Sequence, residues 1–480
     1  MEVSKPHAIL LSSPGMGHLI PMLELGKRLV TLHSFEVTIF VVSSGTSPAE
    51  SQTIQSSMSP KLCQVIELPP VDISSLVESK AKVVANLTVM MREIKPALRS
   101  AISTLKVPPT ALIVDLFGTE ALVIAHEFKI PKYVFIPTHA WFIAFSIYVP
   151  ILDKVVKGEY VDQKEDFVIP GCRPARPEDV VEPMLDRTNQ QYYEYLRMCK
   201  EFTMGDGILL NTWEELESST LAALRDDKLF GDINRPPIYP VGPILRPNGS
   251  AGSRSHELFD WLDRQPSESV VYVSFGSGGT LSNEQMTELA WGLELSQRRF
   301  IWAVRQSTVR TGDGSFFITG KGGDDLSSNL PEGFLIRTQG LGVVVRDWAP
   351  QVDILSHPSV GGFLSHCGWN SALESVTNGV PMIAWPLYAE QRLNAALLTE
   401  ELGVAVRSKI LPSKGIVGRE EINMTVRRIM ADEEGHGIRA RVKELKHKAE
   451  EALSEGGSSY HSLSQFTQNI LMSMQKSPSP

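Results

Sequence analysis

The feature that most constrains the fold is an alternation of short apolar runs with segments of helical period, which occurs twice along the chain. In the first series, HAILLSSP and EVTIFVV have the length and composition of strands, and LIPMLELGKRLVTLH between them has the period of an amphipathic helix. The second series opens at SVVYVSFGS and continues through RFIWAVR, GVVVRDW, VGGFLSH and VPMIAWP. Strands that alternate with crossover helices build parallel sheets, so the pattern predicts an α/β fold with two doubly wound domains.

The two series are separated by VGPILRPNGSAGSRS, a segment rich in Pro, Gly and Ser that has neither helical nor strand period. A chain of 480 residues also exceeds what one hydrophobic core usually supports. We therefore predict an N-terminal domain over residues 1–244, a linker over 245–255, a C-terminal domain over 256–456 and a final helical segment over 457–480.

Charge and composition narrow the partners and the location. The net charge of -9 and the pI near 5.7 give no long-range attraction to nucleic acid or anionic membranes. The polar start EVSKPH lacks the features of a signal peptide, and no apolar stretch reaches the roughly 20 residues that cross a bilayer. We expect a cytoplasmic protein without membrane insertion. Its cysteines are too scattered to predict a disulfide framework or a zinc site: Cys63, Cys172, Cys199 and Cys367.

The first segment that could carry chemistry is SSPGMGHLIP, where a strand stops and a helix begins. Gly15 and Gly17 match the first two glycines of a dinucleotide fingerprint, but Ile20 stands in the place of the third. His18 lies at the start of that helix, beside the carboxyl end of the first strand, where open α/β sheets bind ligands. It is either a structural histidine or a group that faces a ligand.

A second candidate is Asp115, which ends the apolar strand ALIVD. Such a residue either caps the helix that follows or pairs with a buried cation or imidazole. In a doubly wound sheet the ends of two strands can bring His18 and Asp115 together. The two residues would then form a general base and its orienting partner.

The densest candidate region runs from Trp348 to Gln391. Within it SHCGWNS joins a strand to a helix, whose positive end and main-chain N–H groups could hold a diphosphate, with His366 as a further donor. Trp348 offers a face for stacking a base, and Glu374 could accept from ribose hydroxyls. The glycine-rich 274–280 supplies a second anion nest. Taken singly, each of these sequence features more often belongs to a plain loop or to the hydrophobic core. Together they favour a site for a nucleoside diphosphate.

This region resembles the signature box of plant secondary-product glycosyltransferases, from WAPQ through HCGWNS to EQ. The similarity extends over PGMGHLIP, VDLFG, YPVGP, WLDRQP and VYVSFGSGGTLS, which together span nearly the whole chain. SFGSGGTLS and VDLFGTEA are most similar to the branch that glucosylates hydroquinone, monolignols and related phenols. Ser365 and Ala372 stand where many members have Thr, and neither position supplies an essential side chain.

The resemblance implies a GT-B fold of two facing Rossmann-like domains, with the acceptor bound mainly to the first, UDP-glucose to the second, and the C-terminal helix returning to the first. It implies inverting transfer in the cleft between domains, which gives a β-O-glucoside of a hydroquinone, monolignol, coumarin or flavonoid type of acceptor. UDP-glucose is then a co-substrate, and neither a cofactor nor a metal is expected; the chain has no Asp-x-Asp triplet. We expect a monomer.

The same resemblance assigns roles to individual residues. His18 corresponds to the general base and Asp115 to the acid that orients it. Trp348 would stack on uracil, with Glu374 on the ribose. The full set expected to bind the donor is Ser277, Trp348, Ala349, Gln351, His366, Trp369, Asn370, Ser371, Glu374, Glu390 and Gln391. The set expected around the acceptor is Gly17, Phe117, Thr138 and Trp141.

Two other classes of function compete with this interpretation. A nicotinamide-dependent oxidoreductase would explain the first domain, but the third glycine and an acidic ribose ligand about 20 residues later are missing. A catalytically silent UDP-sugar-binding protein would keep the signature box without needing His18 and Asp115. The segment 308–329, rich in Gly, Asp and Ser, is either a mobile surface loop or a variable insertion without function.

Overall fold

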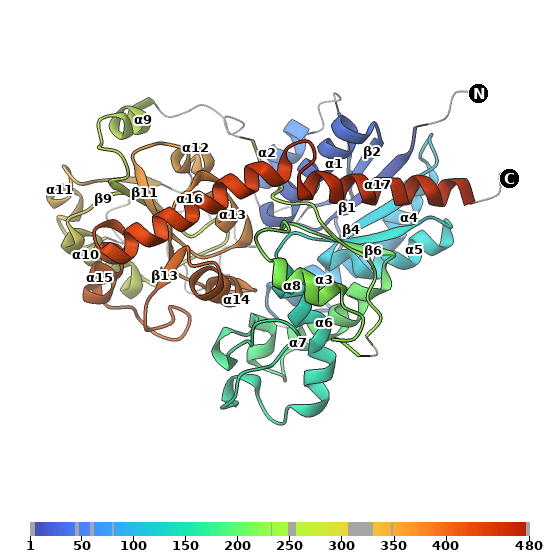
Figure 1. The fold of residues 1–480 in the computed structure, drawn as a ribbon, viewed down its shortest axis with the longest axis horizontal. Helices are drawn as coiled ribbons and strands as arrows, with labels where there is room; N and C mark the ends of the chain where they lie inside the picture. Colours follow the sequence, from blue (N-terminus) through green and yellow to red (C-terminus); the bar gives the residue numbers. More distant parts are fainter. Residues whose placement is uncertain are drawn as a thin grey trace. The chain divides into compact units, whose positions relative to one another are not determined.

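The computed structural model describes residues 5–43, 48–57, 62–78, 81–231, 233–247, 256–305, 330–346 and 349–476. The chain divides into two compact units (Figure 1), the first made of Met1–Leu245 and Glu451–Pro480 and the second of Arg246–Glu450. Segment 308–329 and most of the predicted linker lie outside the described residues. The domain limits given above stay a prediction.

The first unit is built on a parallel sheet of seven strands. They are β1 (His7–Ser12), β2 (Glu36–Val42), β3 (Gln64–Leu68), β4 (Ala111–Asp115), β5 (Lys132–Ile136), β6 (Gly207–Leu210) and β7 (Ile238–Pro240). Their spatial order is β3-β2-β1-β4-β5-β6-β7, and every pair is parallel. The order reverses between β1 and β4, which is the point where doubly wound sheets bind ligands.

Helices cover this sheet because its strands are apolar on both faces. β1 is buried along its whole length. The helices are α1 (Met16–His33), α2 (Pro48–Ser57), α3 (Val83–Glu93), α4 (Lys95–Ser103), α5 (Leu122–Glu127), α6 (Ala140–Val155), α7 (Gln190–Glu201) and α8 (Ser218–Arg225), with the 3₁₀ helix η1 (Leu116–Ala121) among several short ones.

The last helix, α17 (Ser458–Lys476), belongs to the core of the first unit. Leu463, Phe466 and Ile470 are buried in the same cluster as strands β1 and β2. Asn469 also donates a hydrogen bond to the Tyr239 hydroxyl on β7 at 2.7 Å. The end of the chain therefore completes a core that the first half of the sequence begins.

The second unit repeats this architecture with six parallel strands. They are β8 (Val270–Ser274), β9 (Arg299–Val304), β10 (Gly342–Arg346), β11 (Val360–Ser365), β12 (Met382–Ala384) and β13 (Ala405–Arg407), in the order β10-β9-β8-β11-β12-β13. Here the order reverses between β8 and β11. The helices are α9 (His256–Asp263), α10 (Asn283–Ser296), α11 (Phe334–Arg337), α12 (Gln351–Leu355), α13 (Trp369–Asn378), α14 (Gln391–Ala396), α15 (Arg419–Met430) and α16 (Glu433–Leu453), with a π-helical turn over Leu397–Glu401. Two doubly wound domains, as the sequence predicts, are confirmed.

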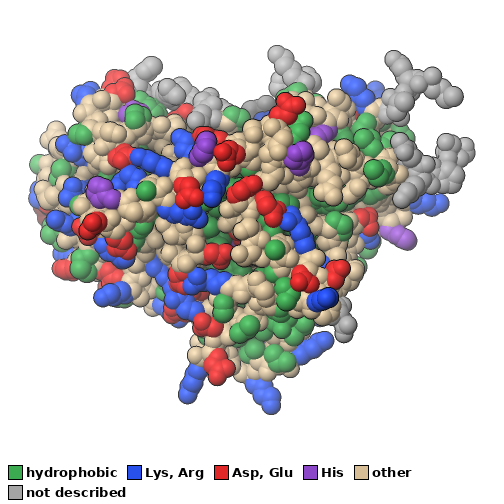
Figure 2. Space-filling view, viewed as in Figure 1, with side chains coloured by type: hydrophobic (Ala, Val, Ile, Leu, Met, Phe, Trp, Pro, Cys, Tyr) green, Lys and Arg blue, Asp and Glu red, His purple; other side chains and the backbone are tan. Residues whose placement is uncertain are grey.

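Charged side chains of both signs are mixed on the face of the molecule drawn in Figure 2. On the face drawn in Figure 2, Lys and Arg side chains of the described residues are interspersed with Asp and Glu side chains, without a broad area of one sign. A basic band of the kind that binds nucleic acid is therefore not seen on this face. Within the described ranges, no helix is long and apolar enough to cross a membrane.

Candidate active site

The strand order of the first unit brings together two residues that are far apart in the sequence. β1 and β4 are neighbours, with Leu11 paired to Val114, so the residues that follow them emerge at the same edge of the sheet. His18 Nδ1 lies 3.4 Å from Asp115 Oδ2. The His18 side chain is 19% exposed and the Asp115 side chain 1%, so a ligand can reach the imidazole but not the carboxylate.

The Asp115 carboxylate is fixed by its own surroundings. Oδ1 accepts from the main-chain N–H groups of Phe117 and Gly118, both at 3.2 Å, which makes Asp115 the N-cap of η1. Oδ2 accepts from the Ser13 N–H at 3.1 Å and from the Ser13 hydroxyl. Both of the alternatives that the sequence left open for Asp115 are therefore true, because one oxygen caps a helix while the other faces an imidazole.

The imidazole of His18 is oriented by Asp115 and Phe117. Nδ1 has no hydrogen-bond partner among the described residues, and a small approach to Asp115 would complete that bond. Such bonds are often long before a substrate binds. The Phe117 ring packs edge-on against the imidazole, with 5.1 Å between ring centroids. With Nδ1 directed at a carboxylate, Nε2 is the nitrogen left to accept a proton.

The two glycines beside His18 do different things. Gly15 has a φ of 101°, a conformation that favours glycine, and its N–H donates to the buried Glu50 at 3.0 Å. An added Cβ at Gly17 would meet no atom within 4 Å. Only Gly15 is therefore required by the chain itself, whereas the open space at Gly17 suits an approaching ligand.

Two predicted acceptor residues lie close together in the sequence but in different surroundings: Thr138 precedes α6, and Trp141 is in its first turn. Thr138 is 3% exposed, and its hydroxyl has no hydrogen-bond partner among the described residues. Trp141 is 1% exposed and its indole N–H donates to the Arg173 carbonyl at 3.0 Å, so the ring is built into the core of the unit. Of the two, Thr138 has a polar atom that a ligand could satisfy.

The start of α6 is held by Glu217, a buried carboxylate. It accepts from the N–H groups of Ala140 and Trp141 at 2.8 and 2.9 Å and from the Thr212 hydroxyl at 2.6 Å. Burial by itself raises the pKa of Glu217, but the neighbouring His139 and these hydrogen bonds outweigh it, and the pKa falls below its usual value. An anion at a helix N-terminus is favourable, so Glu217 anchors the segment that carries Thr138.

In the second unit, β11 leads through His366, Cys367 and Gly368 into α13. No side chain caps the N-terminus of α13, whose cap position is Gly368. The first turn of a helix carries partial positive charge and N–H groups without acceptors inside the helix. The N-terminus of α13 is therefore suited to a phosphate group, as the sequence pattern predicts.

The His366 ring is wedged between two glycine backbones. A Cβ at Gly276 would lie 2.5 Å from the imidazole Cε1, and one at Gly368 would lie 2.5 Å from Nε2. Gly276 also has a φ of +71°. Burial, together with the charge of Arg305, lowers the pKa of His366 to about 4. The imidazole is thus neutral at neutral pH, and glycine is required on both sides of it.

Gln351 connects the starts of α12 and α13. Its amide Nε2 donates to the Ser371 hydroxyl at 2.9 Å and to Glu374 Oε2 at 2.7 Å. Burial raises the pKa of Glu374 to about 7, although the hydrogen bond from Gln351 and the charge of Arg246 act in the opposite direction. Glu374 is therefore a carboxylate whose charge changes near neutral pH.

Gln391 departs from its expected use. Its carbonyl oxygen accepts from the N–H groups of Leu387 and Tyr388 at 2.9 and 3.1 Å. A glutamine side chain can offer a sugar both an acceptor and a donor. The acceptor is already used to shape the preceding loop, so only the amide N–H₂ remains.

The remaining predicted donor residues are placed as follows. Trp348 lies outside the described residues, and its stacking on uracil stays a prediction. Ala349 and Trp369 are buried, while Ser277 is exposed and its carbonyl accepts from Arg305. Glu390 Oε1 accepts from Asn394 at 3.1 Å. Among the described residues, no cluster of three or more His, Cys, Asp or Glu side chains could hold a metal ion.

Several residues that shape these sites were not singled out from the sequence. Ser13 and Glu50 hold the loop before His18, Glu217 holds α6, and Asn394 joins α14 to the Cys367 carbonyl at 2.8 Å. Ser13 follows a buried strand, which is a weak signal. No local pattern indicates the other three, because their partners lie far away in the sequence.

Comparison with known proteins supports a common origin over nearly the full length. The chain is 64% identical over 461 residues to "Anthocyanidin 3-O-glucosyltransferase 5" of Manihot esculenta, covering 96% of this chain and 94% of the relative. It is 43% identical over 464 residues to "Hydroquinone glucosyltransferase" of Rauvolfia serpentina, covering 96% and 97%. The family model "UDP-glucoronosyl and UDP-glucosyl transferase" matches residues 249–433.

A solved structure gives the same result for the fold. "Phytolacca americana UGT2 complexed with UDP-2fluoro-glucose and pterostilbene" matches with a TM-score of 0.86 and 39% identity, covering 98% of this chain and 100% of that one. With two doubly wound sheets and this likeness, the predicted GT-B fold is confirmed.

Proposed function

The chain belongs to the UDP-glycosyltransferase family of plant secondary metabolism, and from this premise we propose that it transfers glucose from UDP-glucose, with inversion, to the hydroxyl of a small phenolic or flavonoid acceptor. The observation that carries the proposal is the His18–Asp115 pair, with 3.4 Å between Nδ1 and Oδ2. A protein that only binds UDP-sugar would have no use for such a pair. Membership of the UDP-glycosyltransferase family argues against a nicotinamide-dependent oxidoreductase.

In the proposed reaction His18 Nε2 takes the proton of the acceptor hydroxyl as its oxygen attacks the anomeric carbon. The bond from that carbon to the diphosphate breaks, and UDP leaves with the electron pair. Asp115 stabilises the imidazolium that forms, as in other histidine–carboxylate pairs. A phenol with a pKa of about 10 needs such help at neutral pH.

The second unit would hold the donor. The end of α13 and the neutral His366 would donate hydrogen bonds to the diphosphate, where negative charge develops as UDP leaves. Glu374 would accept from ribose hydroxyls, and Gln351, which touches both Glu374 and Ser371, would keep that carboxylate in place. These groups would supply the stabilisation that a divalent cation supplies in other transferases.

Donor choice would depend on the end of the signature box. Gln391 Nε2 would donate to a sugar hydroxyl and Glu390 would accept from another. A preference for glucose over galactose would then rest on one well-placed amide donor, because the Gln391 carbonyl is held by Leu387 and Tyr388. The monomeric state and the cytoplasmic location remain predictions.

The direct test is incubation of the purified protein with UDP-glucose and hydroquinone, followed by NMR of the product. We expect a β-glucoside, which inversion of the α-linked donor requires. An α-glucoside would contradict the single displacement. If the protein binds UDP-glucose but neither hydrolyses it nor forms a glucoside, the catalytically silent binding protein is favoured. Turnover with NAD in place of UDP-glucose would favour the oxidoreductase.

A further inference from the structure

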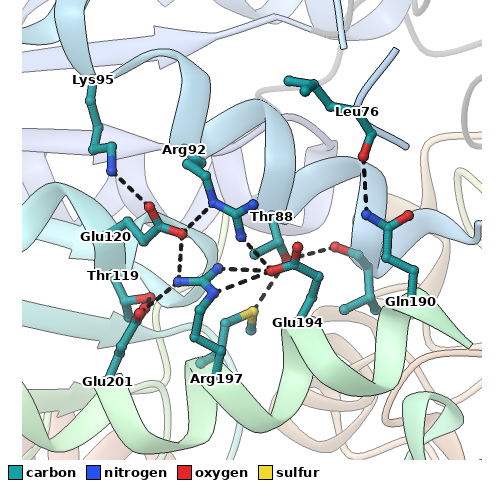
Figure 3. Close-up of polar contacts among 12 residues, drawn as sticks. Leu76, Thr88, Arg92, Lys95, Thr119, Glu120, Gln190, Glu194, Arg197 and Glu201 are labelled. Atoms are coloured by element: carbon teal, nitrogen blue, oxygen red, sulfur yellow. Dashed lines mark hydrogen bonds and ion pairs between the residues drawn. The ribbon is translucent and has the colours of Figure 1, made fainter. Parts of the chain in front are cut away.

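A network of charged side chains lies beside the turn that follows Asp115 (Figure 3). It joins three cations and three carboxylates from four elements: Arg92 on α3, Lys95 on α4, Glu120 on η1, and Glu194, Arg197 and Glu201 on α7. The proposed reaction gives these residues no direct role. Their number and their partial burial call for an explanation.

Glu120 is the centre of the network on η1. Its Oε1 lies 2.5 Å from Arg92 Nε and 2.7 Å from Arg197 Nη1, and its Oε2 lies 2.7 Å from Lys95 Nζ. The side chain is 16% exposed. Burial raises the pKa of Glu120, but Lys95, Arg92 and Arg197 outweigh it, and the pKa falls below its usual value. Glu120 thus stays charged and holds three helices to one short turn.

The α7 side of the network binds the neighbouring residue of the same turn. Arg197 Nη1 lies 2.6 Å from Glu201 Oε1, and Glu201 Oε2 accepts from the Thr119 hydroxyl at 2.7 Å. Arg92 and Arg197 also share Glu194, at 2.6 and 3.1 Å, as Figure 3 shows. Two consecutive residues of η1, Thr119 and Glu120, are therefore fastened to α7.

This fastening matters because of what η1 does for the catalytic pair. η1 is a 3₁₀ helix of six residues, and 3₁₀ runs of that length are poorly stable alone. The N–H groups of Phe117 and Gly118 in its first turn hold Asp115 Oδ1. If η1 shifted, the carboxylate would lose these two donors and could turn away from His18.

We propose that Glu120, bound by Arg92, Lys95 and Arg197, is a positioning residue. It keeps η1 in place, and η1 in turn holds the Asp115 carboxylate toward His18. The inference rests on the proposed role of His18 and Asp115 and adds a residue to it. The ion pair of Arg99 with Glu127 offers a matched control. It joins α4 to α5 at 2.6 and 2.7 Å, and both side chains are 43% exposed. Within the described part of the chain, its ion pair and hydrogen bonds involve no residue of η1.

The test compares Glu120→Gln with Glu127→Gln, using an alkyl-type alcohol and a chlorinated phenol as acceptors. Misplacement of a catalytic group by about 1 Å can cost about a hundredfold, so we expect kcat of Glu120→Gln with the alcohol to fall about tenfold to a hundredfold. The chlorinated phenol ionises without help and should lose much less. KM for UDP-glucose should stay near the wild-type value, and Glu127→Gln should behave as wild type.

Equal losses with both acceptors, or a loss in Glu127→Gln of the same size, would overturn the inference, because both indicate general destabilisation. Should Glu120→Gln fail to fold, Thr119→Val removes the bond to Glu201 without altering a charge, and it should show a smaller loss with the same dependence on acceptor. His18→Ala is measured in parallel. If His18→Ala keeps its activity on the alcohol, the proposed role of His18 and Asp115 fails; if it loses activity while Glu120→Gln does not, only the positioning role of Glu120 fails.

Discussion

The two units share an architecture but stabilise their functional groups by opposite means. In the first unit, hydrogen bonds and ion pairs surround carboxylates, as at Asp115 and Glu120. In the second, burial keeps His366 neutral and raises the pKa of Glu374 to about 7. The difference fits the proposed chemistry, because a general base needs a fixed carboxylate beside it, whereas in the donor site a neutral imidazole would donate to the diphosphate and Glu374, charged above its pKa, would accept from the ribose.

The largest expected effect is that of His18→Ala, which should impair the group proposed as base in the first unit and leave donor binding by the second unit unchanged. His18→Ala should lower glucosylation of an alkyl-type alcohol by about 10²–10⁴-fold, the usual contribution of a general base, while UDP-glucose affinity stays nearly unchanged. Steady-state kinetics and a binding titration measure the two quantities. A chlorinated phenol serves as control, since it ionises without help. Full activity of the variant on the alcohol at neutral pH would show that His18 is not the base.

The variant Gly276→Ala should have the converse effect: it should weaken the binding of UDP and leave the binding of the acceptor unchanged. The new Cβ would lie 2.5 Å from the His366 ring at a φ of +71°. The clash would displace the imidazole from the diphosphate, and the loss of one hydrogen bond to a charged group costs about 1.5–3 kcal/mol, so UDP should bind about 10-fold to 150-fold more weakly. Calorimetry with UDP measures the loss.

The matched control is Gly437→Ala, because an added Cβ at Gly437 meets nothing within 4 Å. We expect its UDP affinity to equal that of the wild type. Unchanged UDP affinity in Gly276→Ala would mean that the wedged imidazole does not shape the donor site.

A third effect concerns pH and follows from Glu374. Its pKa of about 7 means that the carboxylate becomes protonated as pH falls through neutrality, and a protonated group accepts poorly from ribose hydroxyls. UDP affinity should therefore be highest above this pKa and decline by up to about tenfold for each pH unit below it. His366, with a pKa of about 4, does not titrate in that window.

Calorimetry of UDP binding over about two pH units on either side of neutrality measures this profile. Glu374→Gln should bind more weakly and lose the dependence on pH. A profile that persists in Glu374→Gln would assign the titration to another group.

A smaller effect is expected for Gln391→Asn. Shortening the side chain by one methylene withdraws the carbonyl from Leu387 and Tyr388 and the amide from the sugar. Each unpaired group costs roughly 1–3 kcal/mol, enough to weaken glucose transfer about tenfold. Competition between UDP-glucose and UDP-galactose at equal concentration, with one phenolic acceptor, measures donor choice. Equal incorporation of galactose by the wild type would show that Gln391 does not select the sugar.

The smallest expected effect is that of EDTA. If α13 and His366 stabilise the leaving diphosphate, turnover should be unchanged by the chelator. The assay is product formation before and after chelation, with added Mn²⁺ or Mg²⁺ as control. Activity that is lost and then restored by one of these ions would require a different account of the donor site.

Much of the fold could be predicted because its signals are local. The period of a strand or a helix depends on neighbouring residues only, so HAILLSSP, EVTIFVV and their helices indicated a doubly wound sheet directly. The same logic indicated that His18, which follows one strand, and Asp115, which ends another, could meet at one edge of the sheet. The signature box was equally visible, since its residues are contiguous.

Only the tertiary structure decided which groups meet. Strand order and register placed β1 beside β4 and so set the distance from His18 to Asp115. They also brought Ser13 to Asp115. Arg92 and Glu120 likewise meet only after folding. The reason is physical: periodicity is a property of adjacent residues, whereas a hydrogen bond between distant side chains depends on the packing of whole elements, which no local pattern records.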